Sequence, residues 1–68
     1  MYQYTTKITD TLEIVTSETT VEKNFRRFET VEINSFTGNE TYTNQTIHFD
    51  LTDALEAHSE LVAKYSYL

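Results

Sequence analysis

Two imidazoles and a set of carboxylates are the side chains of this sequence that could do chemistry. His58 is the more informative imidazole, because it falls in an apolar stripe at helical spacing, between Leu55 and Val62. We expect a half-buried histidine that hydrogen-bonds to a strand residue, since buried polar groups normally find partners. The alternatives are a general base, or a pH-sensitive group at an interface between copies.

A metal centre is the second chemistry to consider. His48 and Asp50 lie close together, and His58 follows in the next element, so the three could in principle bind one ion. Their spacing matches no common motif and the chain has no Cys, so we predict no metal site and no cofactor. Gly-rich phosphate loops and nucleophile elbows are also absent from the sequence. We therefore expect a protein that is not an enzyme.

The formal net charge is -6, from 11 acidic and 5 basic residues. Direct binding to nucleic acid is disfavoured, because phosphate contacts need clustered Lys and Arg. An acidic surface could instead imitate nucleic-acid phosphates and occupy the basic groove of a nucleic-acid-handling protein, through salt-sensitive attraction. The plainer interpretation is a solvated surface that keeps the protein in solution. The carboxylates we expect to bind such a partner are Glu32, Glu40, Asp53, Glu56 and Glu60.

Aromatic residues are more numerous than a small core needs, with 5 Tyr and 4 Phe in 68 residues. Phe36 and Tyr42 are expected to lie on the sheet face opposite Val31 and Ile47. An aromatic pair outside the core would be a natural anchor for a partner, because Tyr is enriched in interface hot spots. The alternative is that these aromatic side chains cover the sheet edge or pack under a second helix.

Self-association is the second functional hypothesis. A domain this short buries only about 60% of the surface of its unfolded chain. Without disulfides, a second copy is one way to bury more, as a homo-oligomeric structural or regulatory subunit. We expect such an interface to use His58, Tyr65, Lys23, Arg26 and Arg27.

The clearest predicted element is an amphipathic helix from about residue 51 to about residue 67. Asp50 is a suitable N-cap, and Asp53 suits the positive end of the helix dipole. Glu60 and Lys64 are spaced to form an i,i+4 ion pair.

A hairpin is predicted from runs 30–36 and 41–49. A three-residue loop at 38–40 places Val31 opposite Ile47 and Phe36 opposite Tyr42, whereas a two-residue loop pairs apolar with polar residues. We favour the first register because it matches apolar side chains, and Phe49 would then continue the buried face.

The remaining segments leave two architectures open. Residues 2–14 read as a hairpin or one bent strand, and 19–28 as either a strand or a short second helix. Both arrangements are α+β: one domain, 1–68, with an antiparallel sheet of about four strands covered on one face by the C-terminal helix. No apolar run approaches the roughly 20 residues that cross a bilayer, and we expect a cytoplasmic protein that does not bind membranes.

We therefore predict a non-enzymatic acidic inhibitor that binds another protein. In size and charge alone, the chain resembles phage-encoded proteins that disable host defence or nucleic-acid enzymes, which implies the host cytoplasm as its location. This analogy rests on no motif.

Overall fold

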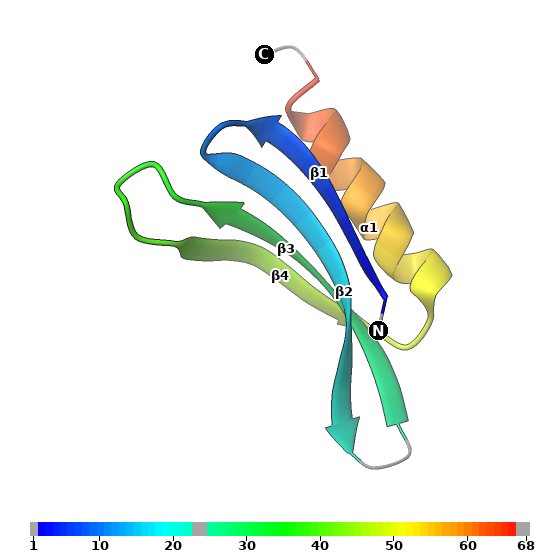
Figure 1. Cartoon of the computed structure of the whole chain (residues 1–68). Helices are drawn as coiled ribbons and strands as arrows, with labels where there is room; N and C mark the ends of the chain where they lie inside the picture. The colour runs from blue at the N-terminus through cyan, green and yellow to red at the C-terminus, as the bar shows by residue number, and fades with distance from the viewer. Residues whose placement is uncertain (1, 23–24, 67–68) are drawn as a thin grey trace.

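The computed structural model describes residues 2–22 and 25–66, and for 20–22 and 25 it describes the backbone only. Four strands are followed by one helix (Figure 1). The elements are β1 (Gln3–Thr9), β2 (Leu12–Glu22), β3 (Phe25–Asn34), β4 (Thr41–His48) and α1 (Leu51–Lys64).

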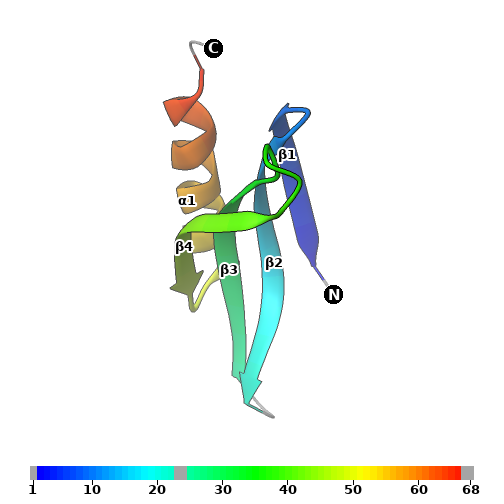
Figure 2. The ribbon, with the colours of Figure 1, turned by 90° about the vertical axis from the view of Figure 1, so that its left-hand side faces the viewer.

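The strands form one antiparallel sheet in the order β1-β2-β3-β4, so each strand pairs with its neighbour in sequence. The helix lies along one face of the sheet, and in Figures 1 and 2 no other element of the described residues covers the opposite face. This arrangement confirms the α+β prediction. The N-terminal segment is a hairpin that turns at Asp10 and Thr11.

Of the two alternatives left open for 19–28, the strand is confirmed and the short second helix is wrong. The segment contributes to β2 and β3, which pair closely along their length as far as Glu22 and Phe25. The run Thr19-Thr20-Val21 is β-branched, and such residues favour strands. The pairing of β2 with β3 shifts in register between Thr20 and Glu22, as at a β-bulge.

The predicted register of the β3–β4 hairpin is also wrong. Ile33 lies opposite Tyr42, and Ile47 lies opposite Glu29, so Val31 does not face Ile47. The connection runs from Ser35 to Glu40, and the register changes again beyond Glu32, close to Asn44, whose φ is 52°. A bulge of this kind moves later residues along the strand, so Ile47 is 56% exposed and Phe49, expected to be buried, is 73% exposed.

The core between sheet and helix is small and rich in threonine. Ile14 and Ala54 are fully buried, and the polar Thr16 and Thr30 are fully buried beside them. The helix begins after Asp50 as expected, although the Asp50 side chain makes no capping hydrogen bond, and it ends at Lys64. Within the described chain, no helix is both long and apolar enough to cross a membrane.

Candidate functional site

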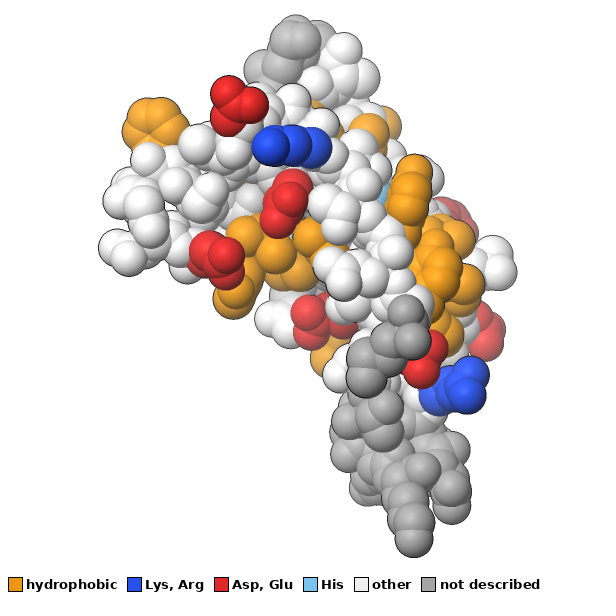
Figure 3. Space-filling view, in the orientation of Figure 1, with side chains coloured by type: hydrophobic (Ala, Val, Ile, Leu, Met, Phe, Trp, Pro, Cys, Tyr) orange, Lys and Arg blue, Asp and Glu red, His pale blue; other side chains and the backbone are white. Residues whose placement is uncertain are grey.

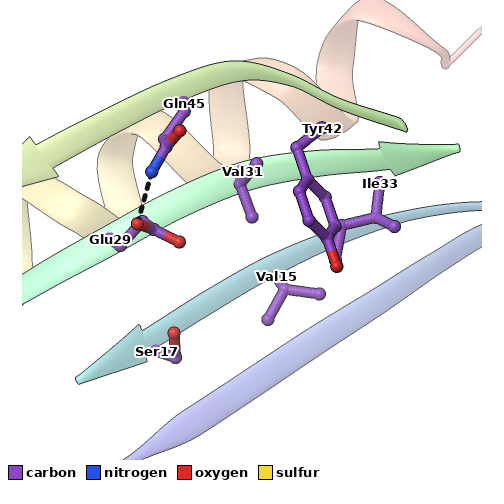
Figure 4. Close-up of a pocket in the computed structure, with 7 residues that line it drawn as sticks. All are labelled: Val15, Ser17, Glu29, Val31, Ile33, Tyr42 and Gln45. Carbon is purple, nitrogen blue, oxygen red and sulfur yellow. Dashed lines mark hydrogen bonds between the residues drawn. The ribbon is translucent and has the colours of Figure 1, made fainter. Parts of the chain in front are cut away.

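The sheet face that the helix leaves uncovered contains an apolar hollow of about 270 Å³. Thr16 and Thr30 pair with each other and point to the helix, so the paired neighbours Val15 and Val31 point the other way. Val15 and Val31 are nevertheless only 8% and 6% exposed, because the side chains around them shield them. Figure 4 shows the lining side chains, which are Val15, Ser17, Glu29, Val31, Ile33, Tyr42 and Gln45.

Carboxylates surround this apolar floor. Glu29 accepts a hydrogen bond of 2.6 Å from Gln45 Nε2, and Glu40 accepts one from the Tyr42 hydroxyl. The hydrogen bond to Glu40 raises the pKa of the Tyr42 phenol, which therefore stays neutral. Figure 3 shows hydrophobic side chains gathered near the centre of this face with acidic side chains around them.

The size of the hollow indicates what it can hold. Pockets for small molecules usually enclose about 300–1,000 Å³ and bury most of the ligand. A smaller, open hollow floored by valine and isoleucine is better suited to a side chain of another protein than to a cofactor. We define the uncovered face by Val15, Val31, Ile33, Tyr42, Glu29 and Glu40 and call it the concave face.

His58 lies on the other side of the sheet, in a buried chain of hydrogen bonds. Thr30 Oγ1 donates its proton to the Ala54 carbonyl oxygen (2.8 Å), so it accepts from Thr16 Oγ1 (2.7 Å). Thr16 has then used its proton and accepts from His58 Nδ1 (2.9 Å). A neutral imidazole has one N–H, so its Nε2 accepts from Thr6 Oγ1 (2.8 Å). The network thus assigns His58 as the neutral Nδ1–H tautomer.

This environment decides between the alternatives for His58. The side chain is 2% exposed, and the Tyr4 ring lies 4.8 Å from it between centroids. Burial lowers the pKa of His58 below its ordinary value. The expectation of a histidine bonded to strand residues is confirmed, although the imidazole is buried and not half-buried. This burial within a single copy does not support the self-association role of His58, which stays a prediction.

Glu32 is buried as well, so it does not belong to an exposed acidic surface as expected. It is 7% exposed and accepts hydrogen bonds from Tyr65 Oη (2.5 Å) and Asn44 Nδ2 (3.0 Å). Burial acts to raise the pKa of Glu32, but these bonds and the charge of Lys64, 3.8 Å away, outweigh it and lower the pKa. Glu32 thus binds both Tyr65 and Lys64. The predicted ion pair between Lys64 and Glu60 is wrong, because Lys64 pairs with Glu32 instead.

The other predicted partner-binding carboxylates separate into two groups. Asp53, Glu56 and Glu60 are exposed on α1, which packs against the face of the sheet opposite the hollow. Glu40 lies next to Tyr42, at the edge of the hollow. The structure therefore does not bring the helix acids and the aromatic anchor onto one surface.

Phe36 and Tyr42 do not form the predicted pair. Tyr42 lies opposite Ile33 on the concave face, whereas Phe36 is 79% exposed in the loop after β3 and does not line the hollow. The backbone N–H of Phe36 donates to Asn34 Oδ1 (2.8 Å), which places Phe36 within a local turn.

The predicted basic cluster makes contacts within its own chain. Arg26 Nε lies 3.8 Å from Glu18, and the Arg27 guanidinium lies 4.1 Å from the centre of the Phe49 ring. Lys23 lies outside the described residues.

Among the described residues, no group of three or more His, Cys, Asp or Glu side chains is placed to hold a metal ion, and His48 bonds to Thr46 instead.

No protein-family model, curated protein or solved structure matches this chain. The candidate site is therefore defined by its geometry. Sequence reasoning found Tyr42 and Glu40 but missed Val15, Val31 and Ile33 as a second apolar face. The signal was present: Val31 and Ile33 alternate with Thr30 and Glu32, which indicates two different faces of one strand.

Proposed function

We propose that this chain is a non-enzymatic, acidic protein-binding module that inhibits a nucleic-acid-handling protein by occluding its basic surface. The observation that carries the proposal is the concave face, an open apolar floor with carboxylates around it. Val15 and Val31 are already nearly covered, so the apolar surface that a partner would remove from water is chiefly that of Ile33 and of the 58% exposed Tyr42, at about 25 cal/mol per Å². The carboxylates would attract a basic partner and accelerate association.

The acidic stripe of α1 adds to the negative field but is a poor imitation of a nucleic-acid strand. Asp53, Glu56 and Glu60 are spread over about 10 Å of helix, at about 1.5 Å per residue. A DNA strand carries one charge per about 3.4 Å of its axis. The stripe is therefore sparser than a phosphate backbone, and we assign the docking contact to the concave face, with α1 contributing long-range attraction.

The test is capture of a partner from a bacterial lysate with the tagged protein. Bound proteins are released with a salt gradient and identified by mass spectrometry. We expect a nucleic-acid-binding protein that is released at moderate salt and displaced by added DNA or RNA, since the attraction is electrostatic. Release that is insensitive to both salt and nucleic acid, or capture of no such protein, would refute the proposal.

Self-association is the alternative, favoured by the exposed apolar side chains of the edge strand β4 and the residue that follows it. Tyr42, Ile47 and Phe49 are 58%, 56% and 73% exposed, and a second copy could cover them. Sedimentation velocity separates the two ideas. A concentration-dependent dimer that dissociates when Ile47 is replaced by Ser would support self-association, and a monomer at all concentrations would exclude it.

A further inference from the structure

We propose that the concave face binds an extended segment of another protein with the pattern basic-x-apolar-x-basic, whose central side chain enters the hollow. This inference rests on the proposed function and names the chemistry of the partner at the same site. It is derived from the residues that line the hollow, from the positions of its carboxylates, and from the engagement of Arg27 within the chain.

The hollow accepts one bulky apolar side chain. Its floor consists of Val15 and Val31, and Ile33 and Tyr42 form one end. Val15 and Val31 are already shielded from water by their neighbours, so a flat partner surface would bury little further apolar area. A side chain that projects into the hollow would bury more and contribute most of the binding free energy.

The carboxylates define where the flanking cations belong. Glu29 and Ile33 are four residues apart on β3, which corresponds to about 13 Å of strand. Glu29 lines the hollow away from the end formed by Ile33 and Tyr42, and Glu40 lies just beyond that end, where it is bonded to the Tyr42 hydroxyl.

In an extended partner, residues i, i+2 and i+4 point to one side and span a similar length. Two cations and a central apolar side chain therefore match Glu29, the hollow and Glu40. The hydrogen bonds that these carboxylates already accept leave further oxygen lone pairs for a Lys or Arg.

The sequence itself contains one segment with this pattern, Lys23-Asn24-Phe25-Arg26-Arg27. Of the two cations that this pattern requires, Arg27 is engaged within its own chain, 4.1 Å from the centre of the Phe49 ring, and Lys23 lies outside the described residues. A second copy would also bring its acidic helix residues into the same negative field. A different, basic protein is therefore the occupant that the contacts favour.

The test uses synthetic peptides with a fluorescent label and fluorescence anisotropy. One peptide has Lys-Ser-Leu-Ser-Lys at its centre, the second has Ser in place of Leu, and the third has the same composition with the two Lys residues adjacent. We expect the first peptide to bind about tenfold more tightly than either other peptide, because only it fills the hollow and reaches both carboxylates.

Variants of the full chain locate the contact. Tyr42→Ser should remove the preference for Leu over Ser, and Glu29→Gln should weaken the salt dependence of binding. Phe36→Ser is the matched control, since this residue is exposed and outside the hollow, and it should leave the preference unchanged.

Equal binding of the three peptides, or no binding, would overturn the inference. The inference would also be overturned if unlabelled protein displaced the labelled peptide and the Phe25→Ser variant did not. That result would assign the hollow to a second copy of the chain. Neither of these peptide results changes the outcome of the lysate experiment, in which a captured nucleic-acid-binding protein is released by salt and DNA. The proposed function therefore succeeds or fails separately.

Discussion

At the scale of single residues, the core depends on hydroxyl groups where larger domains use hydrocarbon. Thr16 and Thr30 are fully buried, and each is satisfied by the network that ends at His58 and the Ala54 carbonyl. Every donor in this chain of bonds has one acceptor, so the arrangement specifies how α1 sits on the sheet. Removing one member leaves another without a partner, which costs more than the bond itself contributes.

The first prediction concerns His58 and pH. Burial places the folded-state pKa of His58 below its ordinary value of 6.5, so the unfolded chain binds a proton first as the pH falls. The stabilisation by neutral His58 is complete above pH 6.5 and is lost as the pH falls towards the folded-state pKa. His58→Gln should lower the free energy of unfolding at neutral pH by about 1–3 kcal/mol and remove this part of the pH dependence.

Denaturant unfolding at a series of pH values checks the prediction. Ser59→Ala, at the exposed neighbouring position, is the control and should retain the wild-type pH dependence. If His58→Gln kept the same loss of stability just below pH 6.5, another group would be responsible.

The second prediction concerns Glu32, whose folded-state pKa lies below its ordinary value of 4.5. The stabilisation by ionised Glu32 is present above pH 4.5 and is lost as the pH falls towards the folded-state pKa. Tyr65→Phe removes one hydrogen bond to the carboxylate, which should raise the pKa of Glu32 and lower the free energy of unfolding by about 1 kcal/mol at neutral pH.

Tyr42→Phe is the matched control, because its phenol bonds to the exposed carboxylate of Glu40. It should change stability much less, since exposed interactions contribute little. A carboxylate titration followed by NMR reads the pKa of Glu32 directly, and an unchanged value in Tyr65→Phe would contradict the account.

These two residues show what could be predicted from sequence at this scale. The stripe position of His58 was enough to predict a half-buried imidazole bonded to a strand, although not its complete burial. Nothing local marks Glu32 as buried, because its partners Asn44 and Tyr65 are 12 and 33 residues away in sequence. A buried charge depends on such distant partners, so alternation along β3 alone could not identify it.

At the scale of elements, the helix was the easiest to predict and the β3–β4 connection the hardest. The helix has one apolar stripe and one acidic stripe, which leave a single way to pack it. Gly38, in the connection, has a positive φ of 87°. A second positive φ, of 52°, occurs at Asn44, which lies inside β4. Matching apolar pairs assumes an uninterrupted strand, so the bulge near Asn44 made that method fail.

The third prediction tests the turn at Gly38. A Cβ added there would meet no atom within 4 Å, so Gly38→Ala introduces backbone strain without a steric clash. The left-handed conformation costs a non-glycine residue about 1–2 kcal/mol, and the free energy of unfolding should fall by that amount. Thr37→Ala is the control in the same exposed loop, and equal stabilities for the two variants would show that the turn does not need its glycine.

At the scale of the whole molecule, the sheet separates two different surfaces. One face is closed by α1 through a network of hydrogen bonds, and the other presents the concave face to solvent. The acidic composition suggested one combined surface of helix acids and aromatics, but the sheet lies between them. Overall charge is visible in a sequence, whereas its division between faces depends on strand register.

The most direct test of the central claim is displacement of nucleic acid from a captured partner. A fluorescently labelled duplex is bound to that partner, and the chain is added while anisotropy is followed. The account predicts that wild type and Phe36→Ser release the duplex, and that Tyr42→Ser requires about tenfold more protein to do so. If the chain bound the partner while the duplex stayed in place, it would not occlude the basic surface, and the account would be wrong.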